Sequence, residues 1–190
     1  KNALILRDLD ILKELNNHGL IGVNISVTSL SEKTRRILEP RTTTIKKRLE
    51  AIHVLSSEGI PVNAMLAPII PGINSHEILN LAKAVSENGA CSIAFIMVRL
   101  NGAIGEIFSN WIKKALPDRA DKVLHQIQEC HGGNLNDGRF GIRGRGEGKI
   151  ATQIHDMVRL AKHLNFKDKK FPKLNTELHE PFKDGQMRMF

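Results

Sequence analysis

No apolar run in the sequence approaches the roughly 18 residues that a membrane-spanning helix needs. The opening residues, KNALILRDLD, do not form a secretory signal, because Arg7 and Asp8 follow an apolar run of only four residues. The chain also lacks an initiator methionine and begins inside an apolar segment. We therefore expect no contact with a membrane and a chain that is a fragment of a longer protein.

Cysteine is scarce, and the two that occur, Cys91 and Cys130, are not related by any short spacing. This excludes a disulfide framework or a cysteine metal knuckle and favours a reduced, cytoplasmic setting. The histidines show no H-E-x-x-H or other ligand spacing, so we predict no metal ligands in this chain. The sequence also lacks three motifs: G-x-S-x-G, a Walker loop, and G-x-G-x-x-G after a strand. Their absence argues against a hydrolase or a nucleotide-binding fold.

Positive charge is in excess, because 28 lysines and arginines face 20 acidic residues and leave a net charge of +8. An excess of this size favours an anionic partner, such as a nucleic acid or a phosphate-bearing cofactor. A solvated basic surface explains the same number equally well.

Apolar segments alternate with amphipathic ones through the first half of the chain. Predicted strands cover Ala3–Arg7, Gly22–Thr28, the start of Pro61–Asn74 up to a break at Pro68, and Ala90–Val98. Predicted helices begin at the caps Asp8, Thr44 and Asn74, the last within a capping box that Glu77 completes, and a further short helix is expected over Ser31–Glu39. This alternation indicates right-handed crossovers and one parallel sheet, whose carboxyl ends are where such folds bind ligands.

The second half of the chain is predicted to be mostly helical. Helices are expected over Glu106–Leu116, Asp118–Cys130 and Ile150–Leu164. Residues 131–148 hold seven glycines and three arginines and predict a long loop, functional or disordered, that could follow a phosphate backbone. Phe140 is the single aromatic residue in it. We expect a partial barrel over residues 1–100, a helical extension over 101–165, and a basic, loosely packed tail over 166–190.

Candidate site residues stand where the predicted strands end. Ser26 and Thr28 share one face of the second strand, Ala67 to Ile70 end the third, and Arg99 closes the fourth. Their hydroxyl, backbone and guanidinium groups would suit a ligand with a carboxylate, a ribose or a phosphate, although each residue alone also fits an ordinary strand end. Arg41 is placed to pair with a ligand carboxylate or, equally, with Glu39 at the surface.

Several segments in order resemble a known family. These are KNALILRDLDILKEL, VNISVTSLSE, LEPRTTTIKKRLEAIHVLSSEGIPV, APIIPGINSHEI, GACSIAFIMVRL and the later WIKKALPDRADKVLHQIQECHGGNLNDGRFGIRGRGEG. Together they resemble radical SAM proteins, and more narrowly a DNA-repair-photolyase-like branch related to spore photoproduct lyase. The resemblance covers nearly the whole chain and is weakest past about Phe166. Its most specific part runs from LEPRTTT to APIIPG.

The resemblance implies a fold and a cofactor set. The fold would be the distal part of a partial (β/α)6, TIM-like barrel of parallel strands in an α/β protein. Cofactors would be S-adenosyl-L-methionine and a 4Fe–4S cluster held by a C-x3-C-x2-C loop, with an electron donor such as flavodoxin or ferredoxin. The enzyme would cleave the cofactor reductively to a 5′-deoxyadenosyl radical, in a lyase-like DNA-repair reaction that leaves a nucleic acid open as substrate. Because the chain has no C-x3-C-x2-C, the cluster ligands are expected upstream of Lys1, and this fragment alone is expected to be inactive.

The resemblance also assigns roles to residues. Lys1 matches a lysine near the methionine moiety, Ser26 a hydroxyl that contacts the cofactor, and Ala67 a backbone contact to adenine. Ile70 would pack on the adenine ring. Further candidates are Thr28 for the ribose, Arg41 for the carboxylate and Arg99 for the substrate. The competing hypothesis is a non-catalytic basic α/β module that binds nucleic acid or a partner subunit.

Overall fold

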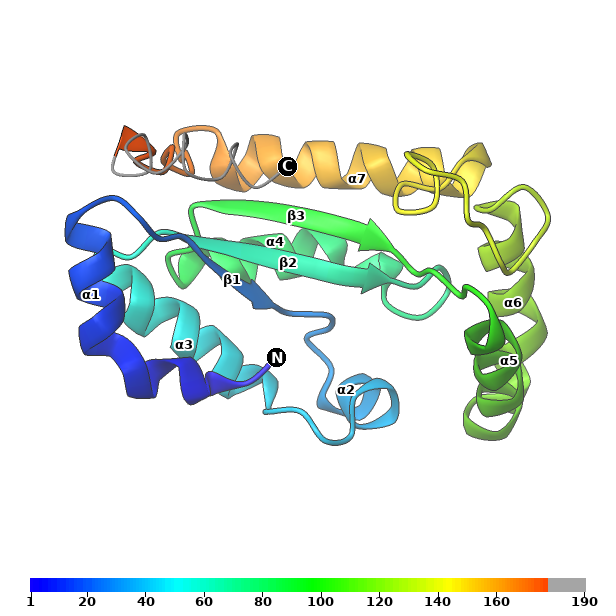
Figure 1. The fold of residues 1–190 in the computed structure, drawn as a ribbon. Coiled ribbons are helices and arrows are strands. Elements are labelled where there is room, and N and C mark those ends of the chain that lie inside the picture. Colours follow the sequence, from blue (N-terminus) through cyan, green and yellow to red (C-terminus); the bar gives the residue numbers. More distant parts are fainter. Residues whose placement is uncertain (178–190) are drawn as a thin grey trace, which may run out of the picture.

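The computed structural model describes residues 1–177 and has a three-stranded parallel sheet at its centre (Figure 1). The strands are β1 (Val23–Ser26), β2 (Val62–Ile69) and β3 (Ser92–Met97), in the order β1-β2-β3. Helices α2 (Glu32–Leu38) and α3 (Ile45–Ser57) connect β1 to β2, and α4 (Ile78–Glu87) connects β2 to β3. The predicted α/β fold with parallel strands is confirmed, and it is consistent with part of a TIM-like barrel.

The main core lies between the sheet and its crossover helices. Val23 and Ile25 alternate with the less buried Asn24 and Ser26, so one face of β1 packs inward. Ile52 and Leu55 of α3 and Leu81 of α4 are buried against the same face of the sheet. These apolar stripes at helical spacing fix the helices on the sheet, as the sequence pattern predicts.

The first predicted strand is wrong, because Ala3–Asp8 forms a 3₁₀ helix, η1, that leads into α1 (Leu9–Asn17). The side chain of Asn2 accepts a hydrogen bond from the Leu4 amide at 3.1 Å and starts the helical turn. A short apolar run cannot be told from a half-buried helical turn by its pattern alone. The predicted cap at Asp8 is also not formed, since this carboxylate instead pairs with the Arg7 guanidinium at 2.8 Å.

The predicted cap at Thr44 is confirmed, and the short helix predicted from Ser31 is capped by that residue. Ser31 accepts from the amide of Thr34 at 3.2 Å at the start of α2, and Thr44 accepts from the amide of Lys47 at 3.4 Å at the start of α3. The predicted strand break at Pro68 is wrong in detail, because β2 continues to Ile69 with a register irregularity between Leu66 and Ile69.

The second half is helical, as predicted, with α5 (Ala103–Ala115), the 3₁₀ turn η3 (Pro117–Arg119), α6 (Ala120–Glu129) and α7 (Gly148–Phe166). Helices α5 and α6 stand at the carboxyl end of the sheet and pack on a second apolar core that includes Ile70, Val98 and Ile112 (Figure 1). Helix α7 runs alongside the sheet and contributes Ile154 and Val158 to the main core. The division into barrel, extension and tail stays a prediction.

The Gly/Arg loop predicted over residues 131–148 contains no helix or strand up to residue 147, where α7 follows, and is attached to the end of β3. The His131 ring contacts the carbonyl of Val98 at 2.9 Å, and the Met97 amide donates to the carbonyl of Gly144 at 3.0 Å. Arg139 holds the loop together by pairing with Asp137 at 2.9 Å and with Glu147 at 2.5 Å.

The tail is attached more firmly than predicted over its described part, residues 167–177, although most of its side chains are exposed. Lys169 donates to the carbonyl of Ser86 at 2.7 Å, and the Asn175 amide donates to the carbonyl of Gly19 at 2.8 Å. The Phe171 ring lies so close to Gly22 that an added Cβ would come within 2.2 Å of it. The tail therefore crosses the amino ends of the strands, and the predicted remainder, 178–190, lies outside the described residues.

Candidate functional site

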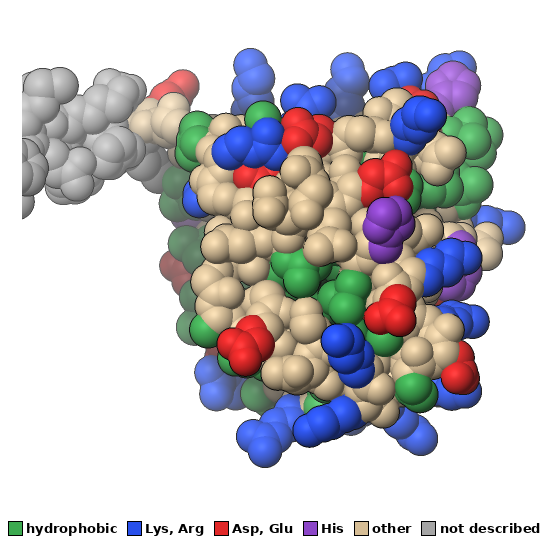
Figure 2. Space-filling model, turned by 90° about the vertical axis from the view of Figure 1, so that its right-hand side faces the viewer, with side chains coloured by type: hydrophobic (Ala, Val, Ile, Leu, Met, Phe, Trp, Pro, Cys, Tyr) green, Lys and Arg blue, Asp and Glu red, His purple; other side chains and the backbone are tan. Residues whose placement is uncertain are grey.

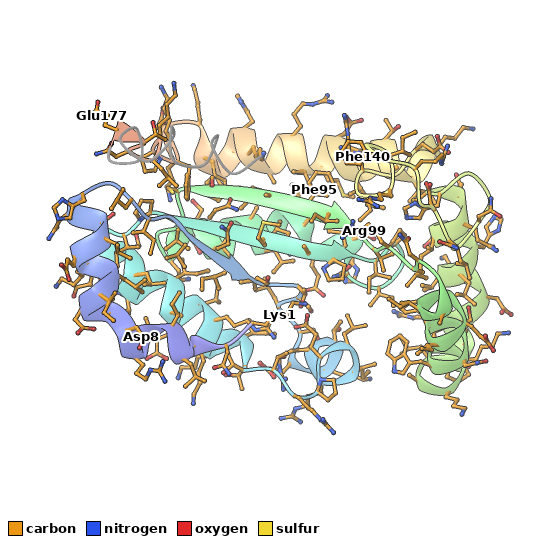
Figure 3. The ribbon with its side chains drawn as sticks, viewed as in Figure 1. Lys1, Asp8, Phe95, Arg99, Phe140 and Glu177 are labelled. Atoms are coloured by element: carbon orange, nitrogen blue, oxygen red, sulfur yellow. The ribbon has the colours of Figure 1, made fainter. Side chains whose placement is uncertain are left out.

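A cavity of about 420 Å³ lies at the carboxyl end of the sheet, between the strand ends and α5. Four of the sequence-predicted site residues line it, namely Lys1, Thr28, Ile70 and Arg99. Figure 3 shows Arg99 directly beyond the tip of β3 and Lys1 close to the tip of β1. The remaining lining residues are Leu38, Glu39, Pro68, Val98, Leu100, Ile104, Ile107, Phe108 and Trp111.

The strand ends that form the cavity floor are joined by the side chain of Asn74, which is only 2% exposed. Its amide oxygen accepts from the Ile70 amide at 2.7 Å, and its amide nitrogen donates to the carbonyls of Thr28 at 2.7 Å and Pro68 at 3.0 Å. Buried amide groups need partners for both their donors and their acceptor, and Asn74 finds them on two neighbouring strand ends. This side chain fixes β1 and β2 at the edge of the cavity.

The predicted capping box of Asn74 and Glu77 is therefore wrong. Glu77 is also buried, and its carboxylate accepts from the Ser29 hydroxyl at 2.8 Å and from the Leu30 amide. Neither side chain caps the helix, and both instead bind the loop after β1. The long-range partners satisfy more of the polar atoms of the two buried side chains than a local cap would.

A buried ion pair stands beside the cavity. Arg48 is 1% exposed and pairs with Glu39 at 2.7 Å. The same guanidinium donates to the carbonyls of Ser26 and Thr43, each at 3.2 Å. Glu39 also accepts from the Thr28 hydroxyl at 3.2 Å and forms an ion pair with Lys1. The network links the end of β1, the start of α3 and the wall of the cavity.

Glu39 stays ionised at neutral pH despite its burial. Burial alone would raise its pKa, but the hydrogen bonds from Lys1 and Arg48 act in the opposite direction, and the net pKa is lower than that of a free glutamate. A carboxyl group held in this way is a poor general acid. It serves instead as a fixed negative charge that orients Lys1, Thr28 and Arg48.

Sequence reasoning missed this pair and instead offered Arg41 either for a ligand carboxylate or, equally, for a surface pair with Glu39. Arg41 is exposed and lies outside the cavity lining, while Arg48 takes the carboxylate. The usable signal was helical spacing, because Arg48 follows Ile45 by three residues and precedes Ile52 by four. Both isoleucines are buried, so the spacing places Arg48 on the inward face of α3, where an arginine needs a partner.

Two other predicted residues, Ser26 and Ala67, are half-buried and do not line the cavity. Ser26 acts here through its carbonyl, which accepts from Arg48, and Ala67 precedes the lining residue Pro68. The roles assigned to all seven site residues stay predictions.

The wall opposite the strand ends is apolar and comes from α5. Ile104 and Ile107 are 54% and 65% exposed, and Phe108 and Trp111 lie beside them with ring centroids 5.3 Å apart. Of the four neighbouring apolar residues on this helix, Ile112 is fully buried, whereas Ile107, Phe108 and Trp111 line the cavity.

The described residues offer no metal centre, since no group of three or more His, Cys, Asp or Glu side chains in 1–177 comes together. Burial raises the pKa of Cys130 to about 11, and burial also raises the pKa of Cys91. Both thiols are protonated at neutral pH, whereas metals and iron–sulfur clusters are held by thiolates. Within the same residues no helix is both long and apolar enough to cross a membrane.

The surface around the site is basic at its rim. Figure 2 views the molecule from the side that α5 and α6 occupy in Figure 1, and Lys and Arg side chains lie mostly around the edge of this face. A few hydrophobic side chains lie near its centre. The arrangement agrees with the net charge of +8 and leaves the middle of the face less charged than its border.

Comparison with known proteins gives two curated relatives. The chain is 35% identical over 71 residues to the uncharacterized protein ORF301 of Acidianus two-tailed virus, which covers 37% of this chain and 23% of that protein. It is 23% identical over 126 residues to the uncharacterized protein MJ0683 of Methanocaldococcus jannaschii, which covers 66% of this chain and 46% of that protein. The match thus spans less than half of each relative, and no solved structure matches the chain significantly.

A family model matches as well, over residues 2–85. That segment contains β1, β2, the Glu39–Arg48 pair and the Asn74 bridge between the strand ends. The part of the chain that builds the polar wall of the cavity is therefore the part that matches the Radical SAM superfamily.

Proposed function

We propose that this chain provides the S-adenosylmethionine side of a radical SAM enzyme, with the cluster ligands on residues outside these 190. The observation that carries the proposal is the superfamily match over residues 2–85, which coincides with the strand ends around the cavity. The competing hypothesis, a basic module without chemistry, is not favoured by that match.

The cavity suits a ligand of this kind. Its volume of about 420 Å³ lies in the range of small-molecule sites. Lys1 offers a cation for the carboxylate of the cofactor, and Thr28 with Glu39 offers polar atoms for its ribose or amino group. Ile70 and Pro68 offer an apolar surface for the adenine ring. Arg48, which also binds the Ser26 carbonyl, holds Glu39 in position from outside the cavity. Arg41 would contact the ligand only from the surface.

The residues present do not fit a 4Fe–4S cluster. The cluster needs three thiolates, whereas Cys91 and Cys130 are the only cysteines and both have raised pKa values. In this proposal, residues outside this segment would hold the cluster. Bound next to it, S-adenosylmethionine would supply a 5′-deoxyadenosyl radical on reduction, while the chain binds and orients the cofactor and excludes water.

The finer parts of the hypothesis stay predictions. These are the photolyase-like branch, a lyase-type reaction on a nucleic acid, and an electron donor such as flavodoxin or ferredoxin. A nucleic-acid substrate is supported by the net charge of +8 and by Phe140, which is 92% exposed with the Arg143 guanidinium 5.8 Å from its ring centroid. The relatives' printed names give no substrate.

The full-length protein tests the chemistry. Reconstituted with iron and sulfide under anaerobic conditions and reduced with dithionite, it should convert S-adenosylmethionine to 5′-deoxyadenosine. A form in which the cluster cysteines are replaced by alanine is the matched control and should give none. An intact, reduced cluster that produces no 5′-deoxyadenosine would contradict the proposal.

A further inference from the structure

Helix α5 exposes one apolar face toward the cavity, although another face of the same helix is buried against the second core. Ile112 and its neighbours pack on α6, yet Ile104 and Ile107, one turn apart, remain 54% and 65% exposed. Exposing an isoleucine instead of burying it forgoes the hydrophobic stabilisation that burial would give. A contiguous exposed apolar wall inside a cavity indicates a ligand that covers it.

A cation stands beside this wall. Arg99 is exposed, lines the cavity at the junction of β3 and α5, and forms no ion pair with residues 1–177. The other two charged groups in the lining are Lys1 and Glu39, and these are engaged with each other while Glu39 also pairs with Arg48. Among the charged groups of the lining, the Arg99 guanidinium is therefore the one without an ion-pair partner in residues 1–177, and it lies beside the α5 wall.

The cavity thus has two chemically different halves. The strand-end half is polar and structured by the Glu39–Arg48 pair. The other half combines Ile104, Ile107 and Trp111 with Arg99. A guanidinium binds carboxylates and phosphates through paired hydrogen bonds, and an adjoining apolar wall selects a ligand with a hydrophobic body.

We propose that the half formed by α5 and Arg99 binds the second reactant, a compound with an aromatic or branched apolar body and one acidic group. The role of this ligand as substrate rests on the proposed function, but its binding does not require the cluster. The apolar body lies against Ile104, Ile107 and Trp111, and the carboxylate or phosphate lies at Arg99.

The chain carries its own reporter for this site. Trp111 is the only tryptophan and the chain has no tyrosine, so intrinsic fluorescence excited in the tryptophan band reports on the α5 wall alone. The probes are hydrocinnamate and phenyl phosphate, with hydrocinnamyl alcohol as the uncharged analogue and acetate as the acid without an apolar body. The two acids should change the fluorescence saturably, the alcohol should bind about tenfold more weakly, and acetate should have no effect. The tighter of the two acids identifies the acidic group.

Two variants with matched controls locate the contacts. Arg99→Gln should weaken the acids about tenfold and leave the alcohol unchanged, whereas Lys113→Gln, at an exposed basic residue of α5 outside the cavity lining, should change neither. Ile107→Ser should weaken acids and alcohol alike, whereas Leu164→Ser, at an equally exposed residue of α7, should not. Circular dichroism should show the same fold in all four variants, because each replaced side chain is exposed.

Equal affinity for acid and alcohol, or acid binding that survives Arg99→Gln, would overturn the proposal. So would a dimer in size-exclusion chromatography that Ile107→Ser dissociates, because the face would then belong to a second copy of the chain. A parallel titration with S-adenosylmethionine separates the two claims. If the acids bind and S-adenosylmethionine does not, only the proposed function is contradicted. If S-adenosylmethionine binds and the acids do not, only this inference is contradicted.

Discussion

The Glu39–Arg48 pair gives the sharpest stability prediction, and Arg48→Met is the perturbation that tests it. The variant keeps an unbranched side chain of similar length but removes the pair at 2.7 Å and two hydrogen bonds to carbonyls at 3.2 Å. Removing one partner of a buried ion pair costs about 3–5 kcal/mol, because the other charge remains buried. Lys1 still contacts Glu39 from a partly exposed position, so we expect the lower end, about 3 kcal/mol.

Urea unfolding followed by far-UV circular dichroism measures this loss. In a chain of this size, about 3 kcal/mol corresponds to a melting temperature lower by about 6–12 °C. Arg159→Met is the matched control, since Arg159 pairs with Asp156 at 3.2 Å on an exposed helix surface and should cost less than about 0.5 kcal/mol. In the double variant with Glu39→Gln, part of the loss should return.

A loss below about 1 kcal/mol for Arg48→Met, the upper end of what a surface ion pair typically contributes, would refute the reasoning. It would mean that Arg48 is solvated in solution and that the wall of the cavity is not organised by this pair. A loss equal to that of Arg159→Met would lead to the same conclusion.

Three further predictions concern the same framework. Asn74→Ala removes three hydrogen bonds, two of them buried, and should cost about 2–3 kcal/mol in urea unfolding, and a loss near zero would contradict the bridge between strand ends. Because the pKa of Glu39 is lowered on folding, its contribution is present above the unfolded value of 4.5 and is lost as the pH falls through the folded value. Melting temperatures between neutral pH and pH 3 should therefore fall less steeply in Glu39→Gln, and parallel curves would contradict the shift. Gly22→Ala should destabilise through the Phe171 ring, which an added Cβ would approach to 2.2 Å, and Phe171→Ala should relieve that loss in the double variant.

Local patterns were sufficient to predict most of the fold. Val23, Ile25 and Val27 alternate as a half-buried strand requires, and the caps Ser31 and Thr44 start helices where they stand in the sequence. These features depend on neighbours within a few residues. The strand prediction for Ala3–Asp8 was wrong because the apolar run is too short to show a periodic pattern. A 3₁₀ turn and a strand were equally compatible with it.

The site was less predictable, because its contacts join residues far apart in sequence. Asn74 reaches the carbonyl of Thr28 across 46 positions, and Glu77 reaches Ser29 across 48, so the local capping pattern was misleading. The strand-end rule still placed Thr28, Ile70 and Arg99 at one cavity. It could not indicate that α5 would close the other side with an apolar wall, since that depends on how α5 packs on α6.

Binding of S-adenosylmethionine to the 190-residue chain is the most direct test of the central claim, and isothermal titration calorimetry measures it without a cluster. We expect one saturable site that Thr28→Val weakens, while Thr152→Val on α7 leaves it unchanged. No heat of binding, or equal affinity in Thr28→Val and Thr152→Val, would contradict the assignment of the cavity to the cofactor.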